Sequence, residues 1–195
     1  MATPNICVRG KKGTQKLNRL FIIALFGAII FVVNVFLLPP LNYLLIVVEA
    51  VLLALSGLFI PKGGASYVGA VGGLLTAVWS PALGLFTFVF AFLFGVFVDV
   101  FIFVFRINPT QMGVNRNRLI LAMVLSTMLI GVVSYSAFAL VPQLVPLIKN
   151  SYVGLFIEAS PMMTMMVLFM GPATGAVAGY AAAYLWNKYL RNIHL

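Results

Sequence analysis

Acidic residues, histidine and cysteine are scarce in this 195-residue sequence. The single cysteine, Cys7, excludes an intramolecular disulfide. The single histidine, His194, argues against haem, copper or zinc chemistry, because those sites usually need several imidazoles or thiols. We therefore expect no metal ion and no other cofactor.

The sequence also lacks the residue patterns of an enzyme. No evident nucleophile is paired with a base, and histidine clusters are missing. A G-x-x-x-x-G-K-[ST] loop, which would hold nucleotide phosphates, does not occur either. We therefore predict that the chain is not an enzyme.

Charged residues make up 8% of the chain, whereas 63% of it is hydrophobic, and the mean hydropathy is +1.14. A soluble domain is usually about one quarter charged, so this chain could not cover itself with polar surface in water. Twelve Lys/Arg against three Asp/Glu give a net charge of +9. Because the basic residues border apolar segments, membrane orientation explains them better than nucleic acid does. The sequence predicts an integral membrane protein with no nucleic-acid partner.

Six apolar stretches have, or nearly have, the roughly 20 residues that a helix needs to cross a bilayer. The first follows a basic region, as a signal peptide would, but it lacks a small-x-small cleavage site and is predicted to be retained. Proline and glycine mark the joints between stretches. The predicted spans are Leu20–Leu38, Leu41–Ile60, Ala65–Ser80, Leu83–Phe105, Leu119–Val141 and Pro161–Trp186.

The distribution of basic residues tests this count. If six spans alternate from a cytoplasmic N-terminus, Lys149 alone lies outside, and omitting the short third span would move three arginines outside. The positive-inside rule thus favours an all-α bundle of six transmembrane helices, residues 20–187, in the plasma membrane. Residues 1–19 and 188–195 are then cytoplasmic tails. The residues predicted inside are Arg9, Lys11, Lys12, Lys16, Arg19, Lys62, Arg106, Arg116, Arg118, Lys188 and Arg191.

Small residues recur every fourth position in two of the spans, which places them on one face of each helix. Lipid gives helices no hydrophobic reason to associate, so close backbone approach through such faces must hold them together. We expect both strips to pack within the bundle. They comprise Ala65, Gly69, Gly73 and Ala77 in the third span, and Gly171, Gly175, Gly179 and Ala183 in the last.

The first span, RLFIIALFGAIIFVV, holds a third strip, formed by Ala24, Gly27 and Ala28. At ~1.5 Å per residue, Ala24 and Ala28 lie roughly 7 and 13 Å past Arg19, within the inner leaflet. Packing inside the bundle and docking on a partner protein both explain such a strip.

Two of the three acidic residues fall within predicted spans, where ionisable groups are costly and often functional. Asp99 lies two turns before Arg106, and we interpret it as structural, paired to an arginine or to a helix end. Glu49 has no obvious basic partner. It either accepts hydrogen bonds in the bundle, is protonated, or lines a polar cavity.

The longest predicted outer connection, residues 142–160, holds a dense polar group. A long ordered loop over a bundle is a plausible lid for a ligand site, although a re-entrant loop with a polar tip would look the same. Trp79 is a candidate ligand stacker or an interfacial belt residue. The predicted substrate-binding residues are Glu158, Lys149, Asn150, Tyr152, Trp79, Asn34 and Glu49.

The whole pattern resembles the substrate-binding S component of energy-coupling factor (ECF) type vitamin importers. The motifs that carry this resemblance are Ala24-Leu-Phe-Gly-Ala28 after a basic tail, GAVGGLLTAVWSPALG (residues 69–84), Gly95-Val-Phe-Val-Asp99, and GAVAGYAAAYLW (residues 175–186) with a basic end. One departure is the short connection around Pro39 to Asn42, since that loop often helps to cover the ligand in the family.

This resemblance implies a transport subunit that captures a vitamin or vitamin precursor at its outer face. The alanine strip of its first helix would dock on a transmembrane coupling subunit, which works with two cytoplasmic ATPases. The competing interpretation is a structural or assembly subunit of a larger membrane complex, such as a respiratory one, which would use the same strips without a ligand pocket.

Overall fold

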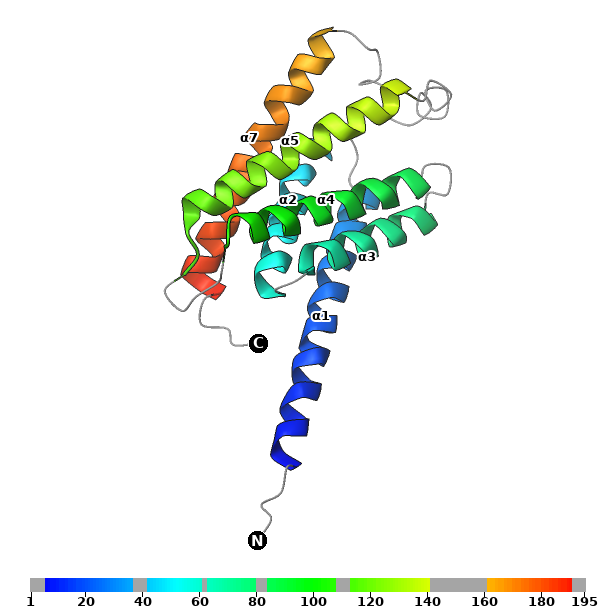
Figure 1. Ribbon diagram of the computed structural model, residues 1–195. Helices are drawn as coiled ribbons and strands as arrows, with labels where there is room; N and C mark the ends of the chain where they lie inside the picture. Colours follow the sequence, from blue (N-terminus) through cyan, green and yellow to red (C-terminus); the bar gives the residue numbers. More distant parts are fainter. Residues whose placement is uncertain are drawn as a thin grey trace.

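The chain is all-helical in the computed structural model, which describes residues 6–36, 42–60, 63–79, 84–107, 113–140 and 161–190. Six α-helices and one π-helical turn lie in these segments, and no strand does (Figure 1). Their bounds are α1 Ile6–Phe36, α2 Asn42–Phe59, α3 Gly64–Trp79, α4 Gly84–Val104, α5 Arg116–Leu140, α7 Pro161–Leu185 and η3 Trp186–Leu190.

Three segments of the described helices are long and apolar enough to cross a membrane: Leu17–Val35, Leu85–Val104 and Arg116–Ser134. Large apolar side chains project outward from them, for example Phe21 at 67% exposure and Phe103 at 82%. Ile46–Phe59 and Gly64–Trp79 are shorter apolar helices. These features are those of a membrane protein, as the composition predicts.

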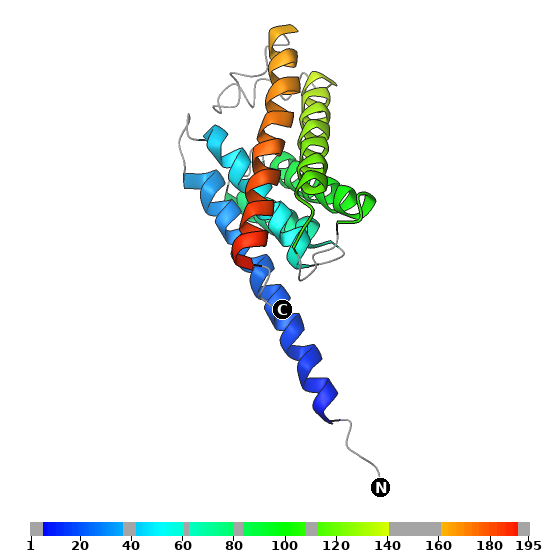
Figure 2. The ribbon, with the colours of Figure 1, turned by 90° about the vertical axis from the view of Figure 1, so that its left-hand side faces the viewer.

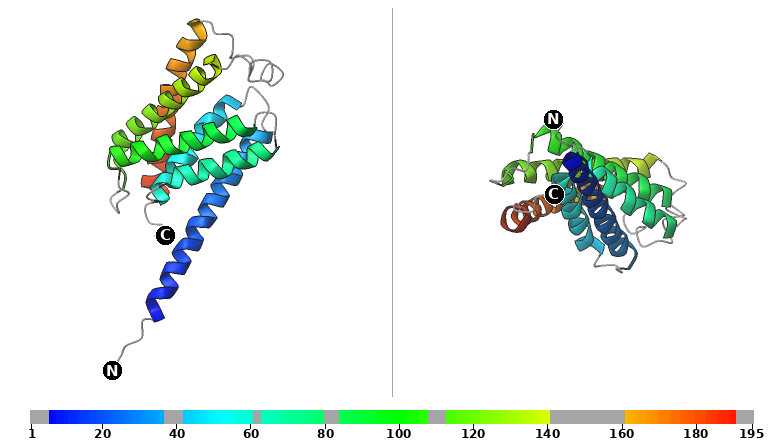
Figure 3. Two further views of the ribbon diagram at one scale, coloured as in Figure 1. Left: turned by 45° about the vertical axis from the view of Figure 1, so that its right-hand side comes forward. Right: turned by 90° about the horizontal axis from the view of Figure 1, so that it is seen from below.

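Helix α3 packs between α1 and α4 through two glycine-bearing faces (Figure 3). A Cβ atom on Gly69 would collide with the carbonyl oxygen of Ala91 in α4, and one on Gly73 would lie 2.9 Å from the Ala91 Cβ. On another face, a Cβ atom on Gly72 would lie 2.8 Å from Ile30 of α1. The strip predicted in the third span therefore packs within the bundle, and this prediction is confirmed.

Helices α5 and α7 form a second close pair and lie side by side in Figure 2. A Cβ atom on Gly179 would lie 2.7 Å from the Ile120 Cα, and one on Gly175 would lie 2.8 Å from the Val124 Cα. Ala183 is fully buried. The strip in the last span is also internal, because glycine lets the two backbones approach this closely.

The interior is apolar and contains few hydroxyl groups. Leu53, Leu58, Val98, Leu119 and Met123 are among its fully buried side chains. The buried hydroxyls donate to carbonyl oxygens of their own helices one turn earlier, as their environment requires. These bonds are Ser56 to Leu53 (2.8 Å), Thr76 to Gly72 (2.9 Å), Ser126 to Ala122 (2.8 Å) and Thr127 to Met123 (2.9 Å).

Helix α1 is longer than the hydropathy predicts. It begins at Ile6 and therefore includes most of the basic segment that the sequence suggested was a tail before Leu20. Figures 1 and 3 show its first half projecting away from the other helices. Hydropathy marks where a helix enters an apolar phase, but it does not mark where hydrogen bonding along the backbone begins.

Candidate functional site

The small residues of the α1 strip face two different surroundings. Gly27 is buried against α3, where an added Cβ would lie 2.7 Å from Val71 Cγ1. Ala24 and Ala28 are exposed. The glycine therefore packs inside the bundle, and the two alanines lie on a surface that the described helices leave uncovered.

These alanines interrupt an exposed face of large apolar side chains. Phe21, Leu25 and Val32 are 67%, 44% and 48% exposed on the same side of α1. Between such neighbours, Ala24 and Ala28 carry only a methyl group each. Side chains of this size permit close approach of another helix to the α1 backbone.

Glu49 lies in the first half of α2, seven residues after the helix begins at Asn42, or about 10 Å along the axis. Its side chain is partly buried. Within the described segments, its carboxyl group neither accepts a hydrogen bond nor forms an ion pair. An unpaired carboxylate is costly in apolar surroundings. Of the three alternatives stated above for Glu49, hydrogen bonding is not observed among these segments, which leaves protonation and a polar cavity.

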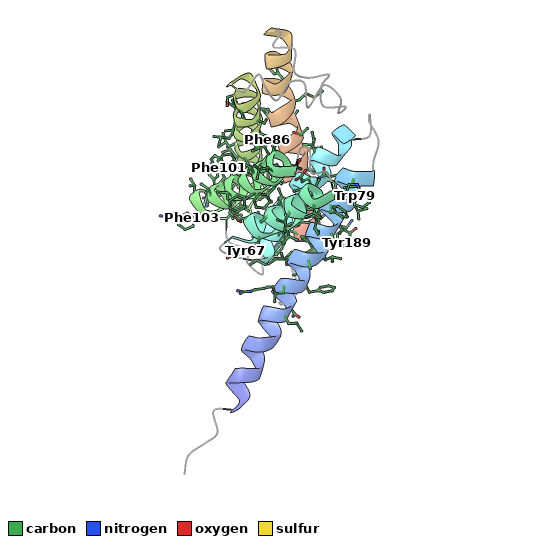
Figure 4. The ribbon with its side chains drawn as sticks, turned by 90° about the vertical axis from the view of Figure 1, so that its right-hand side faces the viewer. Tyr67, Trp79, Phe86, Phe101, Phe103 and Tyr189 are labelled. Atoms are coloured by element: carbon green, nitrogen blue, oxygen red, sulfur yellow. The ribbon has the colours of Figure 1, made fainter. Side chains whose placement is uncertain are left out.

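Asn34 and Trp79 lie at the ends of α1 and α3, toward the end of the bundle where α2 begins. Trp79 is 63% exposed and contacts Phe31 edge-on, with ring centroids 6.3 Å apart. Figure 4 shows it next to the ribbon of α1. Asn34 is half-buried. Outside the described residues lie the other four predicted ligand residues, Lys149, Asn150, Tyr152 and Glu158.

Asp99 has the structural role that the sequence suggests, and its partner is a helix end. Its carboxylate accepts the backbone N–H groups of Ala65 (3.1 Å) and Ser66 (2.7 Å) and the Ser66 hydroxyl (2.6 Å). These donors belong to the first turn of α3, whose N–H groups have no acceptor within the helix. Of the two partners considered, the arginine is wrong: Arg106 is exposed and turns the chain after α4 with a φ of 49°.

The same end of the bundle carries contacts that the sequence did not reveal. Asn187 of η3 accepts the N–H of Val114 (2.7 Å) and donates to its carbonyl oxygen (3.2 Å), joining the end of the chain to the segment before α5. Trp186 packs edge-on against Phe59, with ring centroids 4.9 Å apart. No local sequence pattern signals pairings across such distances in the chain.

Across the residues described, no cluster of three or more His, Cys, Asp or Glu side chains could hold a metal ion. No protein-family model matches the chain, and no curated protein or solved structure is significantly similar to it. A functional assignment therefore depends on the sequence resemblance and on the geometry of α1 and α2.

Proposed function

We propose that this chain is the substrate-capture subunit of an ECF-type importer. It crosses the plasma membrane six times with both termini in the cytoplasm. It binds a vitamin-like solute at the outer face and docks on a transmembrane coupling protein, which two cytoplasmic ATPases drive. In this account the chain itself carries out no chemical reaction.

The exposure of Ala24 and Ala28 is the observation that carries this proposal. A helix face that met lipid chains alone would have no reason to place small residues between Phe21 and Val32. A face that packed inside its own bundle would be covered, as Gly27 is. Exposed small residues on a membrane helix fit a surface kept for another transmembrane helix.

Glu49 supports the capture half of the proposal. It is a carboxyl group in the half of α2 nearest Asn34 and Trp79, and it has no partner among the described residues. A ligand that donates a hydrogen bond or carries a positive charge would satisfy it. We propose that it contributes to the solute site together with residues of the outer connection.

The docking half is tested by the double substitution Ala24→Leu and Ala28→Leu in the tagged full-length chain. We expect co-purification of the coupling subunit and its ATPases to fall about tenfold or more, because two isobutyl groups would prevent close approach of the helices. The melting temperature in detergent should remain unchanged, since both positions are exposed. Mass spectrometry of the co-purified proteins provides the measurement.

Two controls make this result specific. Ala173→Leu adds the same side chain to an exposed position of α7 and should leave co-purification intact. Gly27→Leu collides with Val71 and should lower the melting temperature instead. Capture of respiratory subunits without ATPases would support the assembly-subunit alternative, and unfolding of the Ala24/Ala28 variant would make the strip internal packing.

A further inference from the structure

The end of α7 and the η3 turn that follows it carry a row of exposed tyrosine and lysine side chains. Tyr180, Tyr184 and Lys188 follow one another at intervals of four residues, so they lie along one side of the helix. The Lys188 Nζ donates a hydrogen bond to the Tyr184 hydroxyl (2.7 Å). It also lies 5.2 Å from the ring centroids of both Tyr184 and Tyr189.

A second cation comes from the beginning of α5, which lies beside this part of α7 (Figures 1 and 2). The Arg116 guanidinium carbon is 4.0 Å from the Tyr180 ring centroid. The three tyrosines are 45%, 46% and 59% exposed, and both cations are exposed. We call this group of Arg116, Tyr180, Tyr184, Lys188 and Tyr189 the tyrosine–cation surface.

Nothing in the described part of the chain neutralises these two charges. Of the three acidic residues, Asp99 binds the first turn of α3, Glu49 lies within α2, and Glu158 is outside the described residues. The Tyr184 hydroxyl accepts from Lys188, so its own proton is available to a further acceptor. The surface therefore offers an ammonium, a guanidinium and a phenol to an anionic, oxygen-rich group.

The order of exposed side chains along this helical segment indicates which kind of anion binds there. One turn before Tyr180, the exposed side chain on the same side is Val177, at 56% exposure. The face thus changes from aliphatic to tyrosine to lysine over about 16 Å. That order is typical of a helix passing from hydrocarbon through the headgroup layer into water.

We propose that the tyrosine–cation surface binds the phosphate group of an anionic phospholipid in the leaflet at this end of the bundle. Arg116 and Lys188 pair with the phosphate, and the Tyr184 hydroxyl donates to it. An acyl chain then lies along Val177. This site involves neither the exposed alanines of α1 nor Glu49, so it does not depend on the proposed transport function.

The test compares lipid retention by the full-length chain in detergent, measured by native mass spectrometry after addition of phosphatidylglycerol or phosphatidylcholine. We expect the unaltered protein to retain phosphatidylglycerol preferentially. The affinity of the double variant Arg116→Gln/Lys188→Gln for phosphatidylglycerol should fall about tenfold to thirtyfold, since each basic residue near the membrane surface adds to the free energy of binding to anionic lipid. The control Arg19→Gln/Arg118→Gln has the same net charge and should retain the lipid.

Three results would overturn the proposal. Equal losses in both double variants would indicate attraction by net charge, and retention in both would place the lipid elsewhere. Competition by inorganic phosphate at concentrations comparable to the lipid would assign the surface to a soluble anion. If the Arg116 substitution prevents folding, Lys188→Gln alone provides the test, because the contacts of that exposed ammonium with described residues are those to the exposed side chains of Tyr184 and Tyr189.

Discussion

Gly175→Ala is expected to destabilise the bundle by about 1–3 kcal/mol, although alanine ordinarily stabilises a helix relative to glycine. The new methyl group would meet the Thr127 hydroxyl, the Met123 carbonyl oxygen at 2.7 Å and the Val124 Cα at 2.8 Å. Backbone atoms of α5 cannot turn aside as a flexible side chain can. The helices must separate, and contacts along the α5–α7 pair are lost.

Gly171→Ala in the same strip is the matched control. Its nearest neighbour would be the Thr127 carbonyl oxygen at 3.3 Å, a distance that a small shift relieves. Unfolding in mixed detergent micelles, followed by helical circular dichroism, should therefore rank the variants with Gly171→Ala close to the unaltered protein. Equal stability of the two variants would show that α5 and α7 do not approach as closely as described.

Asp99→Ala is expected to cost about 2–5 kcal/mol of stability, because it leaves two N–H groups of the first turn of α3 without their acceptor inside the bundle. Asp99→Asn should cost less, since its amide oxygen can still accept one of these bonds. Unfolding in the same micelles measures both values.

The Ser66 hydroxyl provides a double-mutant test of this cap. Ser66→Ala alone should cost about 0.5–1.5 kcal/mol. Combined with Asp99→Ala, it should add little, because its partner has already been removed. Full additivity would contradict the hydrogen bond between these two side chains.

Much of the fold could be predicted from the sequence because its elements are set by local properties. Hydropathy and turn residues predict α2, α3, α4, α5 and α7 close to their observed bounds; the third span, for example, is predicted at Ala65–Ser80 and observed at Gly64–Trp79. Only the beginning of α1, at Ile6 rather than near Leu20, lies far from the prediction. The periodic glycines predict the faces through which α3 and α7 pack closely against neighbouring helices. The composition predicts a membrane protein.

The direction in which each small residue points could not be predicted in this way. Ala24, Gly27 and Ala28 form one strip in the sequence, yet Gly27 faces α3 while the two alanines are exposed. Helical spacing fixes relative angles, but the position of α3 decides which angle is covered. The same reason explains why Asp99 could not be assigned to a helix end rather than to Arg106 beforehand.

Contacts between segments that are distant in the chain could not be predicted either, because the sequence does not signal them. The stacking of Arg116 on Tyr180 and the pairing of Asn187 with Val114 both depend on how α5 meets the end of α7. Each of these side chains alone is typical of a solvated helix end. Only the tertiary arrangement determines which of them come into contact.

Ligand binding tests the central claim most directly, because an assembly subunit would share the docking face but would have no solute site. The measurement is thermal unfolding of the purified chain in detergent with thiamine, riboflavin, biotin and folate, each added separately. At about 100 times its dissociation constant, a true ligand should stabilise the protein by roughly 2.7 kcal/mol. Glu49→Gln should reduce the increase in melting temperature that the ligand causes. Asp99→Asn should lower the melting temperature of the free protein but should leave the increase caused by the ligand in place. The absence of any shift across the panel would contradict the account.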